Sequence, residues 1–377
     1  MKNLMYTGMI LAAGLAMTGS ANAASDLKIG IAGPLTGAQA AFGKQLTEGT
    51  EQAIADLNAK GGILGHKVTF EEGDDQADPK QGVSVANKFV GDGIKWVVGH
   101  FDSGVSIPAS DVYKENGMIM ITPSSTNPKL TDRPGYWNVF RTCGRDDQQG
   151  LVAANYIKTH MKGEKIAILD DKTTYGKGLA DVVRAQVKKA GGSFVLDDEI
   201  NAGEKDYSAE VTKIKASGAQ VVYWGGYHPE AGLLIRQMRE QGVKAIIFGA
   251  DGIATDEYAQ IGGDATIGTL MTFGPDATKN PAAKAVVKEF AAKKYNPEAY
   301  TLYSYAAVQV LDQAAVKAKS IDPKKVAAAI HSGMLFHTVI GNFSYDQKGD
   351  RKDLDYVVYT WQKTPDGKIT YLQNKPS

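Results

Sequence analysis

Cysteine is almost absent from this chain, since Cys143 is the only one among 377 residues. A single thiol cannot form a disulfide within the chain, so packing alone must stabilise the fold. Cys143 lies beside Gly144 and Arg145 without the surroundings of a known nucleophile, and we expect it to be buried and inert.

Motifs for catalysis and metal binding are absent as well. The six histidines show no HExxH or other metal-binding spacing, so neither a metal nor a cofactor is expected. The chain contains no GxGxxG, GxxxxGK(S/T) or GxSxG segment, so the local signals of dinucleotide sites, P-loops and hydrolase elbows are missing. His100 precedes Ser103 by three residues, a spacing that matches no known triad and favours a structural histidine.

An excess of charge of one sign is also lacking. Lys and Arg number 42, Asp and Glu number 42, and the formal net charge is zero. This balance gives no support to binding of nucleic acids or other polyanions. We therefore expect a small ligand that is nearly neutral overall.

The N-terminus reads as a cleavable signal peptide, residues 1–23. It contains Lys2, an apolar run around residues 9–17 and the sequence Ser20-Ala21-Asn22-Ala23, which has the small-x-small form of a signal-peptidase site. The apolar run is too short for a membrane span, and no run of 18 or more apolar residues follows it. The expected mature protein is exported to the periplasm without a lipid anchor.

Beyond this leader, strand-like and helix-like segments alternate with short turns, which is the pattern of a doubly wound α/β fold. One series runs from residue 28 to 142, and a second of the same order and spacing runs from about 147 to 248. Two such series predict two similar lobes that face each other across a cleft. We assign residues 24–144 and 275–353 to the N-terminal lobe, and residues 145–274 and 354–377 to the C-terminal lobe, joined by several hinge strands.

Polar residues gather at the ends of two expected strands, residues 96–99 and 118–121. A helix over residues 106–116, with Ser106 as its N-cap, is predicted to connect them. The carboxyl ends of such strands lie side by side, so Phe101, Ser103, Ser124 and Thr126 should share one rim. Hydroxyls and helix N-terminal amides suit a carboxylate or phosphate, although Ser and Thr also serve simply as caps.

Other strand ends carry aromatic residues and one carboxylate. Phe42 follows the first strand, Tyr175 and Tyr227 follow strands of the second series, and Asp251 stands between a buried strand and Gly252. Tyrosine rings offer flat apolar walls with a polar tip, and Asp251 could pair with a cation on the ligand. Together the two rims predict a pocket for a small zwitterion.

The mature chain resembles the periplasmic leucine/isoleucine/valine-binding proteins, the type I solute-binding proteins of ABC transporters. The resemblance runs through KIGIAGPLTG, GDDQADPKQGVSVANK, AGEKDYSA, YWGGYHPEAG and YDQKGD. It implies two Rossmann-like lobes that close around an amino acid and deliver it to an inner-membrane ABC permease, the binding protein being a monomer. By position, the family's carboxylate site corresponds to Ser103 and Thr126. Its ammonium site corresponds to the Ser124 carbonyl, Thr126 and Asp251, and its aromatic walls to Tyr175 and Tyr227.

Departures from the family pattern bear on the ligand. The branched-chain binding proteins have Glu at the position of Asp251, Tyr at Phe42 and a smaller aliphatic residue at Phe101, and their disulfide joins positions here occupied by Ala77 and Asp102. Phe101 and Tyr300 would shorten the pocket, which favours alanine, proline, valine or 4-aminobutyrate. A sensory amino-acid receptor, and a hydrolase or transferase on the same scaffold, are the alternatives to a transport protein.

Overall fold

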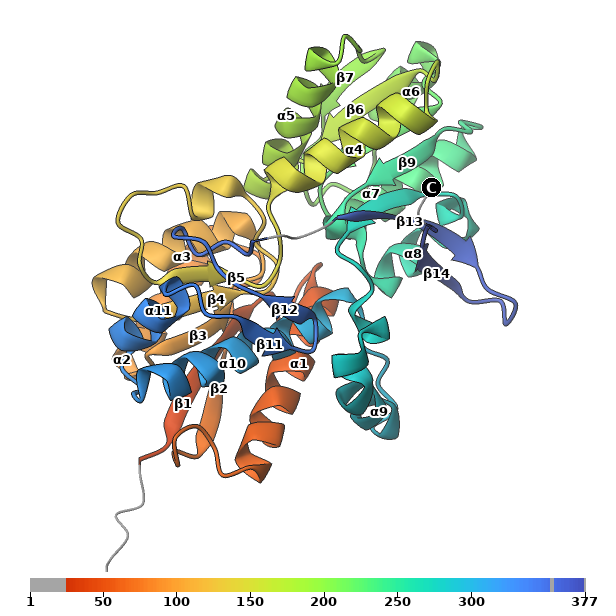
Figure 1. Cartoon of the computed structure of the whole chain (residues 1–377). Helices are drawn as coiled ribbons and strands as arrows, with labels where there is room; N and C mark the ends of the chain where they lie inside the picture. The colour runs from red at the N-terminus through yellow and green to blue at the C-terminus, as the bar shows by residue number, and fades with distance from the viewer. Residues whose placement is uncertain (1–24, 353–355, 376–377) are drawn as a thin grey trace, which may run out of the picture.

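The computed structural model describes residues 25–352 and 356–375, and the expected signal peptide lies outside them. These residues form two lobes, each built on its own sheet (Figure 1). No helix among the described residues has both the length and the apolar character needed to cross a membrane.

The first lobe is built on five parallel strands in the order β2-β1-β3-β4-β5. Their short apolar sequences, such as WVVG and IMIT, are buried on both faces, as expected when helices cover both sides of a parallel sheet. The strands are β1 Leu27–Gly33, β2 Val68–Asp74, β3 Trp96–Gly99, β4 Ile119–Thr122 and β5 Val139–Arg141.

Helices from distant parts of the chain cover the two faces of this sheet. One face packs on residues of α1, α9, α10 and α11, and the other on residues of α2 and α3. The C-terminal helices therefore return to the first lobe, where blue ribbon lies beside red in Figure 1. These helices are α1 Ala40–Ala59, α2 Pro79–Gly91, α3 Ser103–Glu115, α9 Lys284–Ala292, α10 Ala299–Ala318 and α11 Pro323–His331.

The second lobe is built on seven strands in the order β14-β13-β10-β9-β8-β6-β7. The strands from β6 to β10 run parallel, whereas β13 pairs antiparallel with β10 and β14 antiparallel with β13. The strands are β6 Ile166–Asp170, β7 Leu196–Glu199, β8 Val221–Gly225, β9 Ile246–Gly249, β10 Leu270–Phe273, β13 Val357–Lys363 and β14 Ile369–Gln373. The helices of this lobe are α4 Asp146–His160, α5 Thr174–Lys189, α6 Ser208–Ser217, α7 His228–Glu240 and α8 Asp256–Gly262.

The chain passes between the lobes three times. It leaves the first lobe between β5 and α4, returns after β10, and crosses again before β13. The two doubly wound lobes predicted from the sequence are thus confirmed.

Several elements were predicted wrongly or missed, among them helix α8, which the sequence pattern did not predict. Helix α3 begins at Ser103 with Asp102 as its N-cap, so Ser106 lies inside the helix, where its hydroxyl bonds that of Ser125 at 2.6 Å. Strands β10 and β11 (Phe336–Thr338) were not predicted. β11 pairs with β12 (Gly341–Phe343) in a separate two-stranded sheet. Strands of three residues are too short to show a periodic pattern of apolar residues in the sequence.

Candidate functional site

The predicted site residues all follow strands or begin helices where the two lobes meet. Phe101 and Ser103 follow β3, Ser124 and Thr126 follow β4, and Asp251 follows β9. The remaining four lie on α1, α5, α7 and α10 or at their starts: Phe42, Tyr175, Tyr227 and Tyr300.

Aromatic rings from both lobes pack in one cluster. Phe42 stacks on Phe101 with ring centroids 4.5 Å apart, and Tyr300 meets both rings edge to face. From the second lobe, His228 meets Phe42 edge to face at 4.9 Å, and all four rings are buried. Rings of the two lobes are therefore in direct contact, which is the arrangement of a closed cleft.

Asp251 is held by tyrosines from both lobes. The Tyr175 hydroxyl donates to one carboxylate oxygen at 2.7 Å, and the Tyr300 hydroxyl donates to the other at 2.9 Å. Burial raises the pKa of Asp251, while these two hydroxyls oppose the shift. Because each carboxylate oxygen has a second lone pair, Asp251 can still accept hydrogen bonds from a ligand.

Gly252 allows Asp251 to take this position. A side-chain Cβ at Gly252 would lie 2.5 Å from the Gly226 carbonyl oxygen and 2.8 Å from the Tyr175 ring. The absent side chain also lets the Gly252 amide donate to the Tyr175 oxygen at 3.0 Å. The glycine therefore lets the loop after β9 approach α5 and β8 closely.

The predicted hydroxyls differ in what they contact. The Ser124 hydroxyl donates to the Phe101 carbonyl at 2.8 Å, and the Ser103 hydroxyl accepts from the Asn127 amide at 3.2 Å. The Thr126 hydroxyl is buried beside Asp146 of the second lobe, and a hydrogen bond from it lowers the pKa of that carboxyl against the larger effect of burial. Thr126 therefore lies where the lobes meet, whereas the Ser124 hydroxyl fixes its own loop.

The start of α3 provides backbone donors at the same rim. The first hydrogen bond of this helix runs from the Val105 amide to the Asp102 carbonyl at 3.0 Å, so the amides of Ser103 and Gly104 precede it. Amides at a helix start favour anions. Binding of a ligand carboxylate at this end of the site stays a prediction from the sequence.

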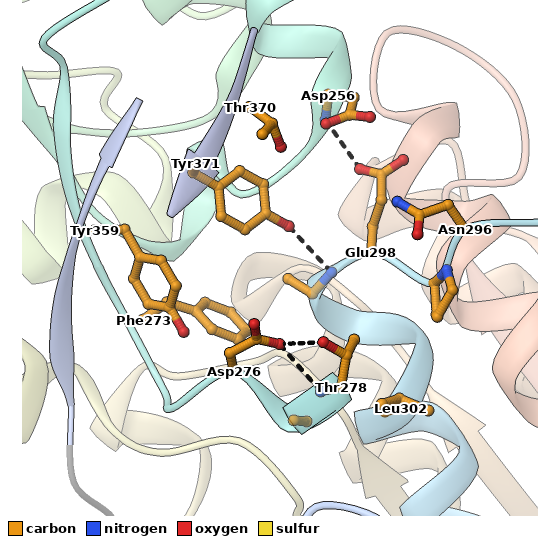
Figure 2. A pocket seen from close by; sticks show the side chains of 13 residues that line it. Asp256, Phe273, Asp276, Thr278, Asn296, Glu298, Leu302, Tyr359, Thr370 and Tyr371 are labelled. Atoms are coloured by element: carbon orange, nitrogen blue, oxygen red, sulfur yellow. Dashed lines mark hydrogen bonds between the residues drawn. The ribbon is translucent and has the colours of Figure 1, made fainter. Parts of the chain in front are cut away.

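Further contacts join the lobes beside the site. The Asn127 side-chain amide donates to the Thr174 carbonyl at 2.8 Å, and Glu298 at the start of α10 accepts from the Asp256 amide at 2.9 Å. Figure 2 shows the contact between Glu298 and Asp256 at the wall of a cavity of about 150 Å³. At the same wall the Ala299 amide donates to the Tyr371 hydroxyl at 3.3 Å. The start of α10, which carries Tyr300, is thus anchored to the second lobe.

Several buried acidic residues were not among the predicted site residues, although Asp102 was expected at the same rim as Phe101 and Ser103. Asp102 and Asp171 are almost fully buried, and burial raises the pKa of each to about 7. Asp75 and Asp171 raise the pKa of Asp102 further, while Tyr227 opposes the shift. Asp146, at the first turn of α4, is completely buried. A carboxylate that begins a helix gives no sign in sequence that a second domain will cover it.

His100 and Cys143, the two residues that could have indicated an enzyme, have structural surroundings. His100 contacts the Asp75 carboxylate at 2.6 Å and the Tyr113 hydroxyl at 2.8 Å, and all three side chains are buried. Cys143 is buried, and burial raises the pKa of its thiol. A thiol that stays protonated is a poor nucleophile, which agrees with the prediction that Cys143 is buried and inert. No group of three or more His, Cys, Asp or Glu side chains suited to a metal ion occurs among the residues with described positions.

Comparisons with known proteins agree along almost the whole chain. A family model described as periplasmic binding protein matches residues 26–368. The Leu/Ile/Val-binding protein homolog 1 of Brucella suis is 53% identical, covering 99% of this chain and 100% of its own length. An amino acid binding protein of Pseudomonas aeruginosa is 51% identical over 96% and 97% of the two chains.

Solved structures show the same fold. The leucine binding protein LivK of Thermotoga maritima has a TM-score of 0.84 at 27% identity, covering 93% of this chain and 99% of its own. The branched-chain amino acid transporter protein LivJ of Streptococcus pneumoniae, solved with isoleucine, has a TM-score of 0.83 at 26% identity, covering 93% and 100%.

Proposed function

Because the chain belongs to the periplasmic binding protein family, among the leucine/isoleucine/valine-binding proteins, we propose that it binds a small aliphatic amino acid between its lobes. The observation that carries this proposal is Asp251, a buried carboxylate held by Tyr175 and Tyr300 from opposite lobes. A buried carboxylate needs a cationic partner, and a ligand ammonium would provide one. The buried Thr126 hydroxyl and the amides at the start of α3 would bind the ligand carboxylate.

The rings at the apolar end favour a compact side chain. The ring centroid of Phe101 lies 4.5 Å from that of Phe42 and 4.8 Å from that of Tyr300, and three rings packed this closely would leave little space for a longer aliphatic side chain. One methylene in an apolar pocket is worth about 1–3 kcal/mol, so the preference should be graded. Alanine, proline, valine or 4-aminobutyrate should therefore bind as well as leucine, or better.

In the cell, the proposed role is to deliver this amino acid to an inner-membrane ABC permease. The chain is a binding protein and not an enzyme, in keeping with the names of its relatives. LivJ of Streptococcus pneumoniae is described as the substrate-binding protein of a branched-chain amino acid transporter, which supports a transport role here. The family to which this chain belongs indicates a periplasmic location. We propose that the protein acts there as a monomer after cleavage of residues 1–23.

A thermal-shift panel of amino acids tests the ligand. We expect the compact amino acids to raise the melting temperature of the wild type at least as much as leucine does. Phe101→Leu should shift the preference toward leucine by roughly tenfold, since it opens the apolar end. Phe89→Leu is the matched control, because Phe89 is a buried phenylalanine of the same lobe on α2. Leucine as the clear best ligand of the wild type would contradict the compact pocket.

Small-angle scattering tests the closure. A ligand that contacts both lobes stabilises the closed state by its differential affinity for it. The radius of gyration should therefore decrease when the best ligand of the panel is added at saturation. Identical scattering profiles with and without that ligand would count against hinge closure.

A further inference from the structure

Asn127 joins the two rims of the proposed site without being one of the predicted site residues. It follows Thr126 in the loop after β4, and its side chain is buried. Its Nδ2 amide donates to the Thr174 carbonyl at 2.8 Å. Thr174 is the first residue of α5 in the second lobe, and the next residue is Tyr175, which holds Asp251. The bond therefore connects the segment that carries Thr126 to the segment that carries Tyr175.

Other hydrogen bonds hold Asn127 in place within the first lobe. Its side-chain oxygen accepts from the Lys129 amide at 2.9 Å and so caps the short helix Pro128–Leu130. Its backbone amide donates to the Ser103 hydroxyl, at the start of α3, at 3.2 Å. Because these partners all belong to the first lobe, we expect the side-chain amide of Asn127 to keep its direction when the lobes separate.

Two glycines leave the space in which this contact forms. A Cβ at Gly178, one turn after Thr174 on α5, would lie 2.4 Å from the Asn127 Nδ2 atom. A Cβ at Gly104, the second residue of α3, would lie 3.3 Å from the Thr174 hydroxyl. Neither glycine has a positive φ, so the backbone does not require glycine at either position. Since glycine within a helix is less stabilising than alanine, the missing side chains serve the close approach of α3 and α5.

In the proposed hinge motion, the Asn127–Thr174 bond is lost when α5 moves away from the loop after β4. We propose that this bond, with Gly178 beside it, is a latch that stabilises the closed state and sets how long a bound amino acid stays. Both polar atoms of the Asn127 side chain have protein partners, so Asn127 is a positioning residue that acts through Thr126 and Tyr175. The inference rests on the proposed function, since it concerns closure around the same ligand.

Asn127→Ser tests the bond by calorimetry and stopped-flow kinetics, with alanine, valine and leucine as probes. Serine can still cap the helix Pro128–Leu130, but it is too short to reach Thr174. The affinity for all three amino acids should fall by the same factor, at least about fivefold, and dissociation should become faster by that factor. The affinity ratios among the three should stay within about twofold, whereas loss of a side chain that touches the ligand would change them.

Gly178→Ala tests the same contact from the second lobe. Its Cβ would displace the Asn127 amide, so the affinities should fall as in Asn127→Ser. The melting temperature of the unliganded protein should rise, because alanine stabilises a helix relative to glycine and separated lobes leave space for the methyl group. Gly91→Ala is the matched control, since Gly91 is the last residue of α2 and a Cβ there meets nothing within 4 Å. It should leave the affinities unchanged.

The double variant distinguishes one shared contact from two separate defects. In the Asn127→Ser background, Gly178→Ala should weaken binding by less than about twofold, since the bond is already lost. Multiplied losses, unchanged affinity in either folded single variant, or altered ratios among the three amino acids would overturn the inference. If circular dichroism shows that Asn127→Ser does not fold, Gly178→Ala decides alone through its opposite effects on affinity and melting temperature. A wild type that binds none of the three amino acids would refute the proposed function, and this inference with it.

Discussion

The hydrogen bond between Tyr300 and Asp251 makes the strongest prediction about affinity. Tyr300 lies on α10 of the first lobe, and its hydroxyl donates to the Asp251 carboxylate of the second lobe at 2.9 Å. Because the bond joins the two lobes, we expect it to form only in the closed state of the proposed hinge motion. Tyr300→Phe removes the hydroxyl and keeps the ring. The centroid of this ring lies 4.8 Å from that of Phe101 and 5.2 Å from that of Phe273.

The size of the effect follows from the burial of both partners. A hydrogen bond to a charged group is worth about 1.5–3 kcal/mol, which corresponds to roughly ten- to a hundredfold in affinity. Since we expect the bond in the proposed closed state alone, Tyr300→Phe should lower ligand affinity by that factor. It should change the stability of the unliganded protein much less.

Tyr305→Phe provides the matched control. Tyr305 lies on the same helix, and its hydroxyl donates to the Asp56 carboxylate at 2.6 Å, but Asp56 belongs to α1 of the same lobe. Its loss should lower the free energy of unfolding without weakening binding. Titration calorimetry with the tightest ligand of the panel, together with urea unfolding, measures both quantities. Unchanged affinity in Tyr300→Phe, or an equal loss in Tyr305→Phe, would refute the reasoning.

Two other substitutions test the carboxylates. Asp251→Asn should weaken amino-acid binding at least about tenfold by calorimetry, because the ammonium loses a charged partner, and unchanged affinity would exclude Asp251 from the ammonium site. Asp102→Asn should raise the free energy of unfolding of the ligand-saturated protein at pH 8 by roughly 1–3 kcal/mol, and less at pH 5. The sign follows because burial raises the pKa of Asp102 from 3.8 to about 7, so the wild type loses stability as the pH rises between these values. Urea unfolding at both pH values checks this, and a variant no more stable than wild type at pH 8 would contradict the buried charge.

The sequence alone was sufficient for the architecture of the lobes. Buried parallel strands are short continuous apolar runs, and WVVG and IMIT are found as β3 and β4. Because ligands bind at the carboxyl ends of such strands, the residues that follow them could be proposed as a site. Phe101, Thr126 and Asp251 indeed lie where the lobes meet.

Only the tertiary structure could decide which of these side chains are free to bind. Ser124 and Thr126 look alike in sequence, yet the Ser124 hydroxyl donates to the Phe101 carbonyl of its own lobe, whereas the Thr126 hydroxyl lies beside Asp146 of the second lobe. Hydrogen-bond partners depend on loops that meet in space, and no local pattern records them.

The same holds for contacts between the lobes. Tyr300 and Asp251 are 49 residues apart and meet only because the C-terminal helices return to the first lobe. Asp146 reads as an ordinary acidic residue at a helix start, yet the assembled lobes bury its side chain completely. Burial of a polar group depends on how the two lobes pack together. The sequence by itself therefore determined which strand ends could form the site, and the tertiary structure determined which of the carboxylates there are buried and what they contact.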